Sequence, residues 1–124
     1  MKKNIAMKWV KALRSGKYEQ GKKMLRSLDS KYCCFGVLCD ISWLYEWHPC
    51  YCIDSGFYYY GRSIYILNDV VCEWAGMKHF TGRHKTVSGV DRSLTNYNDN
   101  GDLDGTPCTF DKIADGIEIN YKAL

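Results

Sequence analysis

Closely spaced cysteines in the segment KYCCFGVLCD, residues 31–40, are the residues most suited to metal or redox chemistry. Its cysteines and the next candidate ligands along the chain are Cys33, Cys34, Cys39, His48, Cys50 and Cys52. A structural zinc site usually takes two pairs of ligands, each pair separated by two to four residues. Here the first two cysteines are adjacent, the third follows after four residues, and one residue separates the last two. We therefore predict buried core thiols, with a zinc-stabilised domain as an open alternative.

A partial calcium-binding pattern lies in the loop that begins at residue 98. Asn100, Asp102 and Asp104 occupy the first, third and fifth positions of an EF-hand loop, and Asp111 occupies the twelfth. The first position is an amide and the twelfth is the short Asp, whereas calcium loops favour Asp and Glu there. A solvated acidic turn is the simpler interpretation, and calcium is an open alternative.

Catalytic patterns are weak in this chain. A cysteine nucleophile needs a base within reach, but no local motif ties His48, His79 or His84 to a cysteine. The loop carboxylates show no acid–base pairing. We expect no enzymatic activity, no cofactor and no bound metal.

Basic and aromatic residues favour binding of a small phosphorylated ligand. Residues 1–31 hold ten Lys and Arg against two acids, and the whole chain has ten tyrosines and four tryptophans. Arginine binds phosphate through two parallel hydrogen bonds, and aromatic rings stack on flat ligands. The predicted ligand-binding residues are Arg26 and Arg92 for phosphate, Tyr32 for stacking, Asn98 and Asp99 for ribose or base, with Arg14 and Lys17 as reserves. The chain has no G-x-G-x-x-G motif and no P-loop.

Length and composition limit the classes of protein to which this chain can belong. A chain of 124 residues with 46% hydrophobic and 25% charged residues is typical of one globular domain, which we place at residues 1–124. It has no apolar run of 18 residues, and Lys8, Lys11 and Arg14 interrupt any leader-like segment at the start. We expect a cytoplasmic protein with reduced thiols and no membrane contact. A pI near 8.4 is low for a duplex binder, so nucleic acid is not an expected partner.

Apolar periodicity predicts four helices that would position these residues. The first is capped by Asn4 and stops at Gly16, and the second runs from Cys34 to the Trp47-His48-Pro49 segment. The third is capped by Asn68 and stops at Gly76, and Thr109 caps the last. Gly36, inside the second helix, indicates close approach of another backbone.

Short strands are predicted between the helices. They are residues 23–28, a hairpin of 57–60 and 63–66 around Gly61-Arg62, and residues 86–90 and 93–97, followed by a turn-rich loop at 98–107. Because helices and strands alternate without a βαβ rhythm, we predict a small α+β domain of about four helices packed on a short antiparallel sheet.

Several segments resemble a family of short phage and prophage proteins. The segments are LRSGKYEQG at 13–21, Leu25-Arg26, KYCCFGVLCD at 31–40, Trp74-Ala75-Gly76, NDNG at 98–101 and FDKIAD at 110–115. In that family the first motifs read roughly LRSGKY-Q-G and YCCLGVLCDL. This chain departs with Phe35 where Leu is usual, and with longer tyrosine-rich and Asp/Gly-rich loops.

The resemblance implies a phage or prophage accessory protein. Small phage proteins of this size often act against host immunity, and Thoeris anti-defence sponges sequester cyclic ADP-ribose or cyclic-nucleotide signals without cleaving them. It therefore implies a counter-defence protein that sequesters such a signal as a homo-oligomer. The alternative is an inhibitor of a host protein that docks through the basic N-terminal helix, where Lys8, Lys11 and Arg14 share one face.

Overall fold

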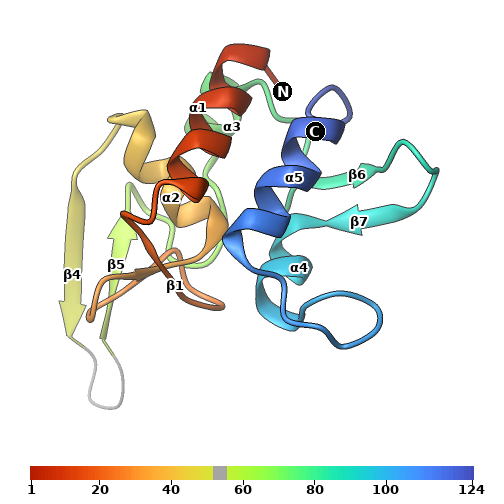
Figure 1. Ribbon diagram of the computed structural model, residues 1–124. Coiled ribbons are helices and arrows are strands. Elements are labelled where there is room, and N and C mark those ends of the chain that lie inside the picture. The colour runs from red at the N-terminus through yellow and green to blue at the C-terminus, as the bar shows by residue number, and fades with distance from the viewer. Residues whose placement is uncertain (52–55) are drawn as a thin grey trace.

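The computed structural model describes residues 1–51 and 56–124, which form five helices, a five-stranded sheet and a two-stranded sheet (Figure 1). The helices are α1 (Lys3–Arg14), α2 (Cys34–Ser42), α3 (Asp69–Ala75), α4 (Leu94–Asn100) and α5 (Phe110–Asn120). The strands are β1 (Glu19–Gln20), β2 (Arg26–Ser27), β3 (Lys31–Tyr32), β4 (Trp47–Tyr51), β5 (Gly56–Tyr60), β6 (Arg83–Lys85) and β7 (Asp91–Ser93). The predicted α+β class is confirmed, with one more helix than expected.

The core lies where α1, α2 and α5 meet. Trp9 of α1 is fully buried, stacks on Phe35 of α2 with ring centroids 5.6 Å apart, and donates its indole N–H to the carbonyl oxygen of Cys34. Ile113 and Ile117 of α5 are buried in the same cluster. The apolar faces of these three helices thus pack together into one hydrophobic core.

The larger sheet has the strand order β1-β3-β2-β5-β4. Its β1–β3 pair is parallel and its other pairs are antiparallel, so the expectation of a purely antiparallel sheet is wrong. The strand β4 forms one edge and contains Pro49, a residue that an edge strand tolerates because it needs no donor on the open side. The strands β6 and β7 form a separate antiparallel hairpin.

Close backbone approach at Gly36 is confirmed. A Cβ at this position would overlap the carbonyl oxygen of Leu25, which lies just before β2. The N–H of Cys33 also donates to this carbonyl oxygen, so the start of α2 packs directly on the chain entering β2. Only glycine leaves the space for this crossing.

Five of the seven predicted helix ends are confirmed, including the stop of α1 at Gly16, which has a φ of 72°, and the start of α2 at Cys34, whereas the predicted cap of α1 is wrong. Asn68 and Thr109 cap α3 and α5 with their side chains, and Gly76 ends α3 with a φ of 67°. Asn4 does not cap α1, because the helix begins at Lys3 and the N–H of Lys2 donates to the carbonyl oxygen of Ala75. The first turn of α1 is therefore tied to the end of α3.

The second helix ends earlier than predicted, and the hairpin after it is displaced. Trp43 adopts a φ of 55° and stops α2, so the chain from Trp47 onward forms β4 instead of helix. This strand pairs with β5 along its whole length. The turn at Gly61-Arg62 does form, since Tyr60 and Ser63 exchange both backbone hydrogen bonds, but residues 63–66 are not a strand.

The predicted strands at 86–90 and 93–97 are also wrong. Residues 86–90 form the turn between β6 and β7, where the N–H of Thr86 donates to Val90 and that of Gly89 donates to Thr86. Ser93 caps α4 through its side chain, so residues 94–100 are helical. Part of the predicted loop at 98–107 therefore belongs to a helix.

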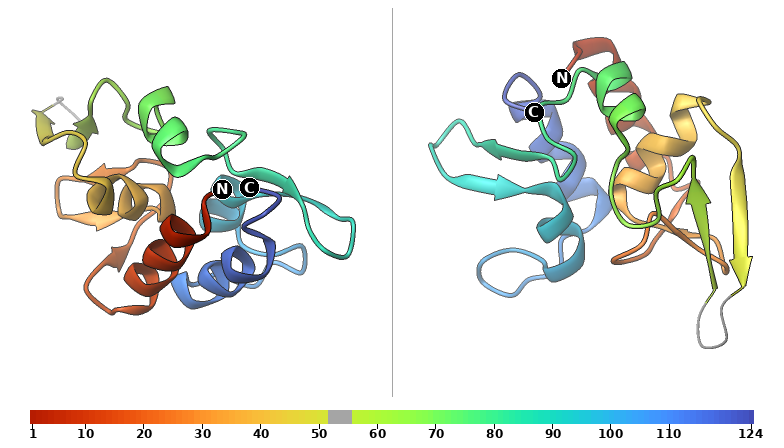
Figure 2. Two further views of the ribbon diagram at one scale, coloured as in Figure 1. Left: turned by 90° about the horizontal axis from the view of Figure 1, so that it is seen from above. Right: turned by 180° about the vertical axis from the view of Figure 1, so that it is seen from behind.

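The ribbon places the two sheets on opposite sides of the central helices, with both termini close together at one end (Figures 1 and 2). The β4–β5 pair lies beyond α2, and the β6–β7 hairpin lies beyond α5. Within the described ranges, none of the helices has the length and apolarity needed to cross a membrane.

Candidate functional site

A cleft of about 310 Å³ lies between the β6–β7 hairpin, α4 and the loop that follows α4. Most of its lining residues are polar or charged, and they include two arginines from neighbouring strands. The lining residues are Arg83, Asp91, Arg92, Ser93, Asn96, Tyr97, Asn100, Gly101, Asp102 and Leu103. The volume falls at the lower end of the range for small-molecule sites.

Arg92 is held in place within this cleft. Its guanidinium lies 3.3 Å from the carboxylate of Asp102 and 4.8 Å from the ring centroid of Tyr97, and its side chain is 19% exposed. These contacts fix the donor fork before any ligand arrives, which lowers the entropy lost on binding. Arg83 on β6 is exposed at the same cleft.

Local structure explains how the strands and α4 enclose the cleft. Ser93 ends β7 and starts α4, since its hydroxyl oxygen accepts from the N–H of Asn96 and its O–H donates to the carbonyl oxygen of Thr81. At the other end of α4, Gly101 has a φ of 80°, and the N–H of Asp102 donates to Thr106. This tight turn after α4 brings Asp102 back toward Arg92.

The two guanidinium groups are the parts of this cleft that can bind an anion, while Asp91 and Asp102 line it as well and balance their charge. Two guanidinium groups supply forked N–H donors, and the neighbouring asparagine amides supply further polar contacts. Asp102 competes with a ligand for Arg92, so an anion must bind more strongly than this carboxylate does. Burial raises the pKa of Tyr97, while Arg92 favours ionisation of its hydroxyl.

Asn98 and Asp99 lie outside this cleft and hold the fold together. The buried side chain of Asn98 accepts hydrogen bonds from the N–H of Cys34 and the amide of Gln20, and it donates to the carbonyl oxygen of Gly21. Asp99 accepts from the N–H of Lys23. Their amide and carboxylate groups join α4 to the β1–β3 region.

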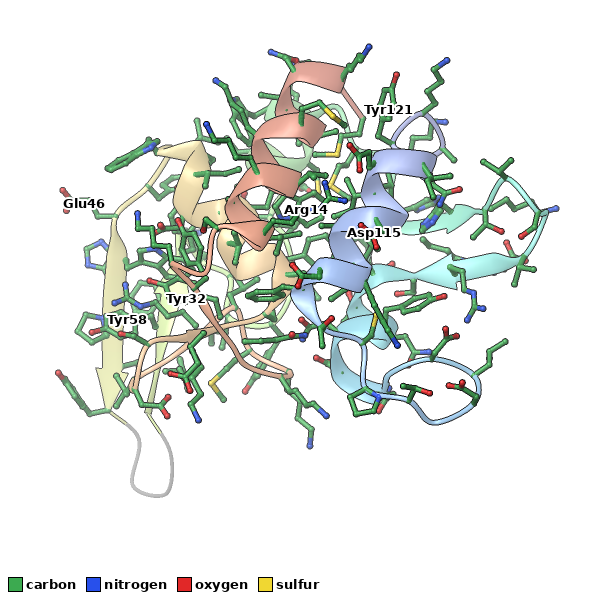
Figure 3. The ribbon with its side chains drawn as sticks, viewed as in Figure 1. Arg14, Tyr32, Glu46, Tyr58, Asp115 and Tyr121 are labelled. Atoms are coloured by element: carbon green, nitrogen blue, oxygen red, sulfur yellow. The ribbon has the colours of Figure 1, made fainter. Side chains whose placement is uncertain are left out.

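Arg26 and Tyr32 are brought together, but in a packed aromatic cluster away from the cleft. The Arg26 guanidinium lies 4.0, 5.2 and 5.6 Å from the ring centroids of Tyr58, Tyr32 and Trp47. Figure 3 shows Tyr32 and Tyr58 in this cluster beside β4 and β5. The guanidinium donates to the hydroxyl oxygen of Ser30, and its Nε is buried without a hydrogen-bond partner among the described residues.

Arg14 and Lys17 are separate from both groups. Arg14 joins α1 to α5 through ion pairs of 2.5 and 2.8 Å with Asp115 and Glu118, and Figure 3 shows Arg14 facing Asp115. These carboxylates raise the pKa of the Arg14 guanidinium. Lys17 is exposed, with its ammonium 5.4 Å from the ring centroid of Tyr18. The basic face proposed for α1 therefore retains its lysines, while Arg14 already has acidic partners.

The cysteine block is buried, as predicted. Cys33, Cys34 and Cys39 are at most 5% exposed. Burial raises the pKa of Cys33 to about 11 and holds the pKa values of the other two well above the ordinary thiol value. Such thiols are poor nucleophiles and poor metal ligands.

Neither metal hypothesis gains support from the described residues, where no three His, Cys, Asp or Glu side chains converge on a possible ion. In the suspected calcium loop, Asp104 accepts from the N–H and hydroxyl of Thr106, and Asp102 accepts from the N–H of Leu103. Cys52, a candidate zinc ligand, lies outside the described residues.

Residues that the sequence interpretation did not select complete the cleft. Arg83 and Tyr97 both line it; the sequence offers Arg83 as one of eight cations suited to phosphate, but neither residue is among the predicted ligand-binding residues. The available signal was the Ser88-Gly89 turn, because a hairpin centred there pairs Arg83 with Ser93 and His84 with Arg92. With strands predicted at 86–90 and 93–97 instead, Arg83 and Tyr97 are not expected to lie side by side.

The comparisons with known proteins identify a family but not an activity. The sequence matches the family described as Domain of unknown function (DUF8296) over residues 1–121. No curated protein and no solved structure matches the chain. Because the match covers nearly the whole sequence, the chain belongs to the DUF8296 family.

Proposed function

We propose that this protein binds a small phosphorylated ligand in the cleft formed by Arg83 and Arg92, without catalysing a reaction on it. The main support is the pre-positioned guanidinium of Arg92, which lies 4.8 Å from the ring centroid of Tyr97 and 3.3 Å from the carboxylate of Asp102. A second guanidinium, from Arg83, lines the same space of about 310 Å³.

The chemistry of the cleft and the resemblance to phage proteins both favour a nucleotide-like ligand. Two forked donors favour a phosphate or diphosphate, and the cleft volume is that of a compact ligand. A cyclic nucleotide or a cyclic ADP-ribose isomer is therefore the first class to test. Sequestration of such a signal would make this a phage or prophage counter-defence protein of the host cytoplasm.

Titration calorimetry of the purified protein tests the proposal. The panel consists of cyclic mono- and dinucleotides, cyclic ADP-ribose isomers and inorganic phosphate. We expect at least one organic member to bind, and Arg92→Lys and Arg83→Gln each to weaken its affinity by about tenfold through loss of charged hydrogen bonds.

Lys85→Gln provides the matched control, because Lys85 is an exposed cation on the same strand, β6, but does not line the cleft. Its affinity should equal that of the wild type. Binding that survives the combined loss of Arg83 and Arg92 would place the ligand elsewhere. If no member of the panel gives heat, the proposed ligand class is wrong.

A further inference from the structure

Trp43 has an unusual conformation and an unusual exposure. It ends α2 with a φ of 55°, a left-handed conformation that glycine adopts more readily than any other residue. Its side chain is 89% exposed, so burial within the chain does not compensate for this strain. A large, strained and solvated indole is a feature typical of functional contacts.

An open groove lies beside Trp43. Two adjoining hollows of about 430 and 530 Å³ share Tyr45 and Glu46 and run between the end of α2, the β4–β5 pair and the start of α3. Trp43 lines the first hollow, and Tyr59 and Val70 line the second. The larger hollow exceeds an indole side chain in volume.

Charges of both signs lie along the same groove. Glu46, Arg62 and Asp69 all line the larger hollow, and all three residues are exposed. In residues 1–51 and 56–124, none of the three makes an ion pair. Figure 3 shows Glu46 pointing away from the ribbon near the start of β4.

We propose that this surface is the contact face of a symmetric homodimer, in which Trp43 of each copy enters the groove of the other. An apolar projection, an adjacent groove and unpaired charges of both signs on one face make a self-complementary surface. Two-fold symmetry places each projection against the other copy's groove in a single closed contact. Because Glu46 follows Trp43 by three residues and Arg62 lines the groove that receives the partner's Trp43, the same operation would place Arg62 near Glu46 of the partner subunit.

The first test measures the association of the full chain by sedimentation equilibrium over a range of concentrations. We expect a monomer–dimer equilibrium for the wild type. Trp43→Gly should raise the dimer dissociation constant by about 30-fold, the effect of losing a hot-spot side chain. The glycine also suits the left-handed backbone, so this variant should unfold at no lower temperature than the wild type.

Val87→Ala is the matched control, because Val87 is another highly exposed apolar side chain, on the distant β6–β7 turn. It should leave the dissociation constant unchanged. A wild-type protein that stays monomeric at all concentrations would overturn the proposal, as would a Trp43→Gly variant that associates like the wild type.

The second test exchanges the charges and does not depend on Trp43. Arg62→Glu and Glu46→Arg should each weaken self-association, since each homodimer then opposes like charges. An equimolar mixture of the two variants should form a heterodimer, because both contacts between residues 46 and 62 regain opposite charges. Failure of the mixture to associate more tightly than either variant alone would show that these two residues do not face each other.

Discussion

The buried amide of Asn98 joins three segments that lie far apart in the sequence. Its oxygen accepts from the N–H of Cys34 and the amide of Gln20 at 3.1 and 3.2 Å, and its nitrogen donates to Gly21 at 2.9 Å. Asn98→Ala would leave the buried N–H of Cys34 without a partner. We expect a loss of about 3 kcal/mol in the free energy of unfolding, measured by urea denaturation.

Asn96 of the same helix is the control for this prediction. It is exposed, so Asn96→Ala should change the free energy of unfolding by less than about 0.5 kcal/mol. If Asn98→Ala behaved like the control, the hydrogen bonds of Asn98 would not stabilise the fold, and ligand binding would be the better explanation for this side chain.

Asp102 competes with any anion for the guanidinium of Arg92, from which its carboxylate lies 3.3 Å away. Asp102→Asn removes this competing charge. We expect the affinity for inorganic pyrophosphate, measured by calorimetry, to rise by about fivefold, the upper range for a partly exposed ion pair. Asp104→Asn changes the same net charge outside the cleft and should leave the affinity as it was. A weaker affinity in Asp102→Asn would indicate that Asp102 positions Arg92 more than it competes.

The buried thiols make stability depend on pH in the alkaline range. Burial raises the pKa of Cys33 to about 11, against 9.0 for an ordinary thiol, and raises that of Cys39 well above the same value. Above pH 9 the unfolded chain therefore loses these protons while the folded protein keeps them, so stability falls as the pH rises toward 11. The slope approaches roughly 1 kcal/mol per pH unit for each thiol.

Urea unfolding midpoints across this pH range measure the effect. Cys39→Ala should unfold with a shallower alkaline slope than the wild type, because one buried thiol is gone. Cys39→Ser keeps the size of the side chain but buries a hydroxyl, so it should lower stability at neutral pH as well. Equal slopes in the wild type and Cys39→Ala would show that Cys39 is not protected from ionisation.

For this protein the sequence predicts helices better than strands. The ends of α3 and α5 follow from local chemistry, because Asn68 and Thr109 accept hydrogen bonds within the next turn. The end of α2 does not, because Trp43 is a poor residue for a left-handed cap. The two-residue strands β1, β2 and β3 form from long-range pairing and have no periodicity to detect.

We expect the same substitution, glycine to alanine, to have opposite effects on stability at two glycines inside helices. Gly36 of α2 touches the backbone of Leu25, so Gly36→Ala must push α2 away from β2 and should lower the free energy of unfolding by at least about 3 kcal/mol. Gly116 of α5 has no atom within 4 Å of its missing Cβ. Gly116→Ala should raise stability by about 0.5–1 kcal/mol through helix propensity.

Circular dichroism in urea, with both variants and the wild type in parallel, measures this contrast. The pair controls for the chemistry of the change, because both variants add one methyl group to a helical glycine. If the two substitutions had effects of the same sign, packing between α2 and the chain before β2 would not be the reason for glycine at position 36.

The residues of the predicted site do not converge in the folded molecule, and Arg14 and Lys17 lie apart from the rest. Arg92 lines the cleft, Arg26 and Tyr32 form an aromatic cluster, and Asn98 belongs to a buried junction. Residue type alone indicates what arginine and tyrosine can bind. Which of these side chains meet in one cleft depends on the pairing of β6 with β7 and on the turn that follows α4. These are tertiary features, which is why the sequence predicted Arg92 without Arg83 or Tyr97.

The β6–β7 hairpin, which lines the cleft, and the β4–β5 pair, which lines the groove beside Trp43, lie at opposite sides of the central helices (Figures 1 and 2). Sites that are well separated and share no partners are usually energetically independent. Ligand binding and self-association should therefore vary separately. Trp43→Gly should change the calorimetric affinity of the tightest-binding panel member by less than about twofold.

In the converse measurement, Arg92→Lys should leave the dimer dissociation constant at its wild-type value. A ligand site shared between two subunits makes a different prediction, in which loss of the dimer removes the ligand site. Parallel calorimetry and sedimentation of both variants separate these arrangements. A loss of affinity in Trp43→Gly would mean that the ligand contacts both subunits, and each cleft would then be only part of the site.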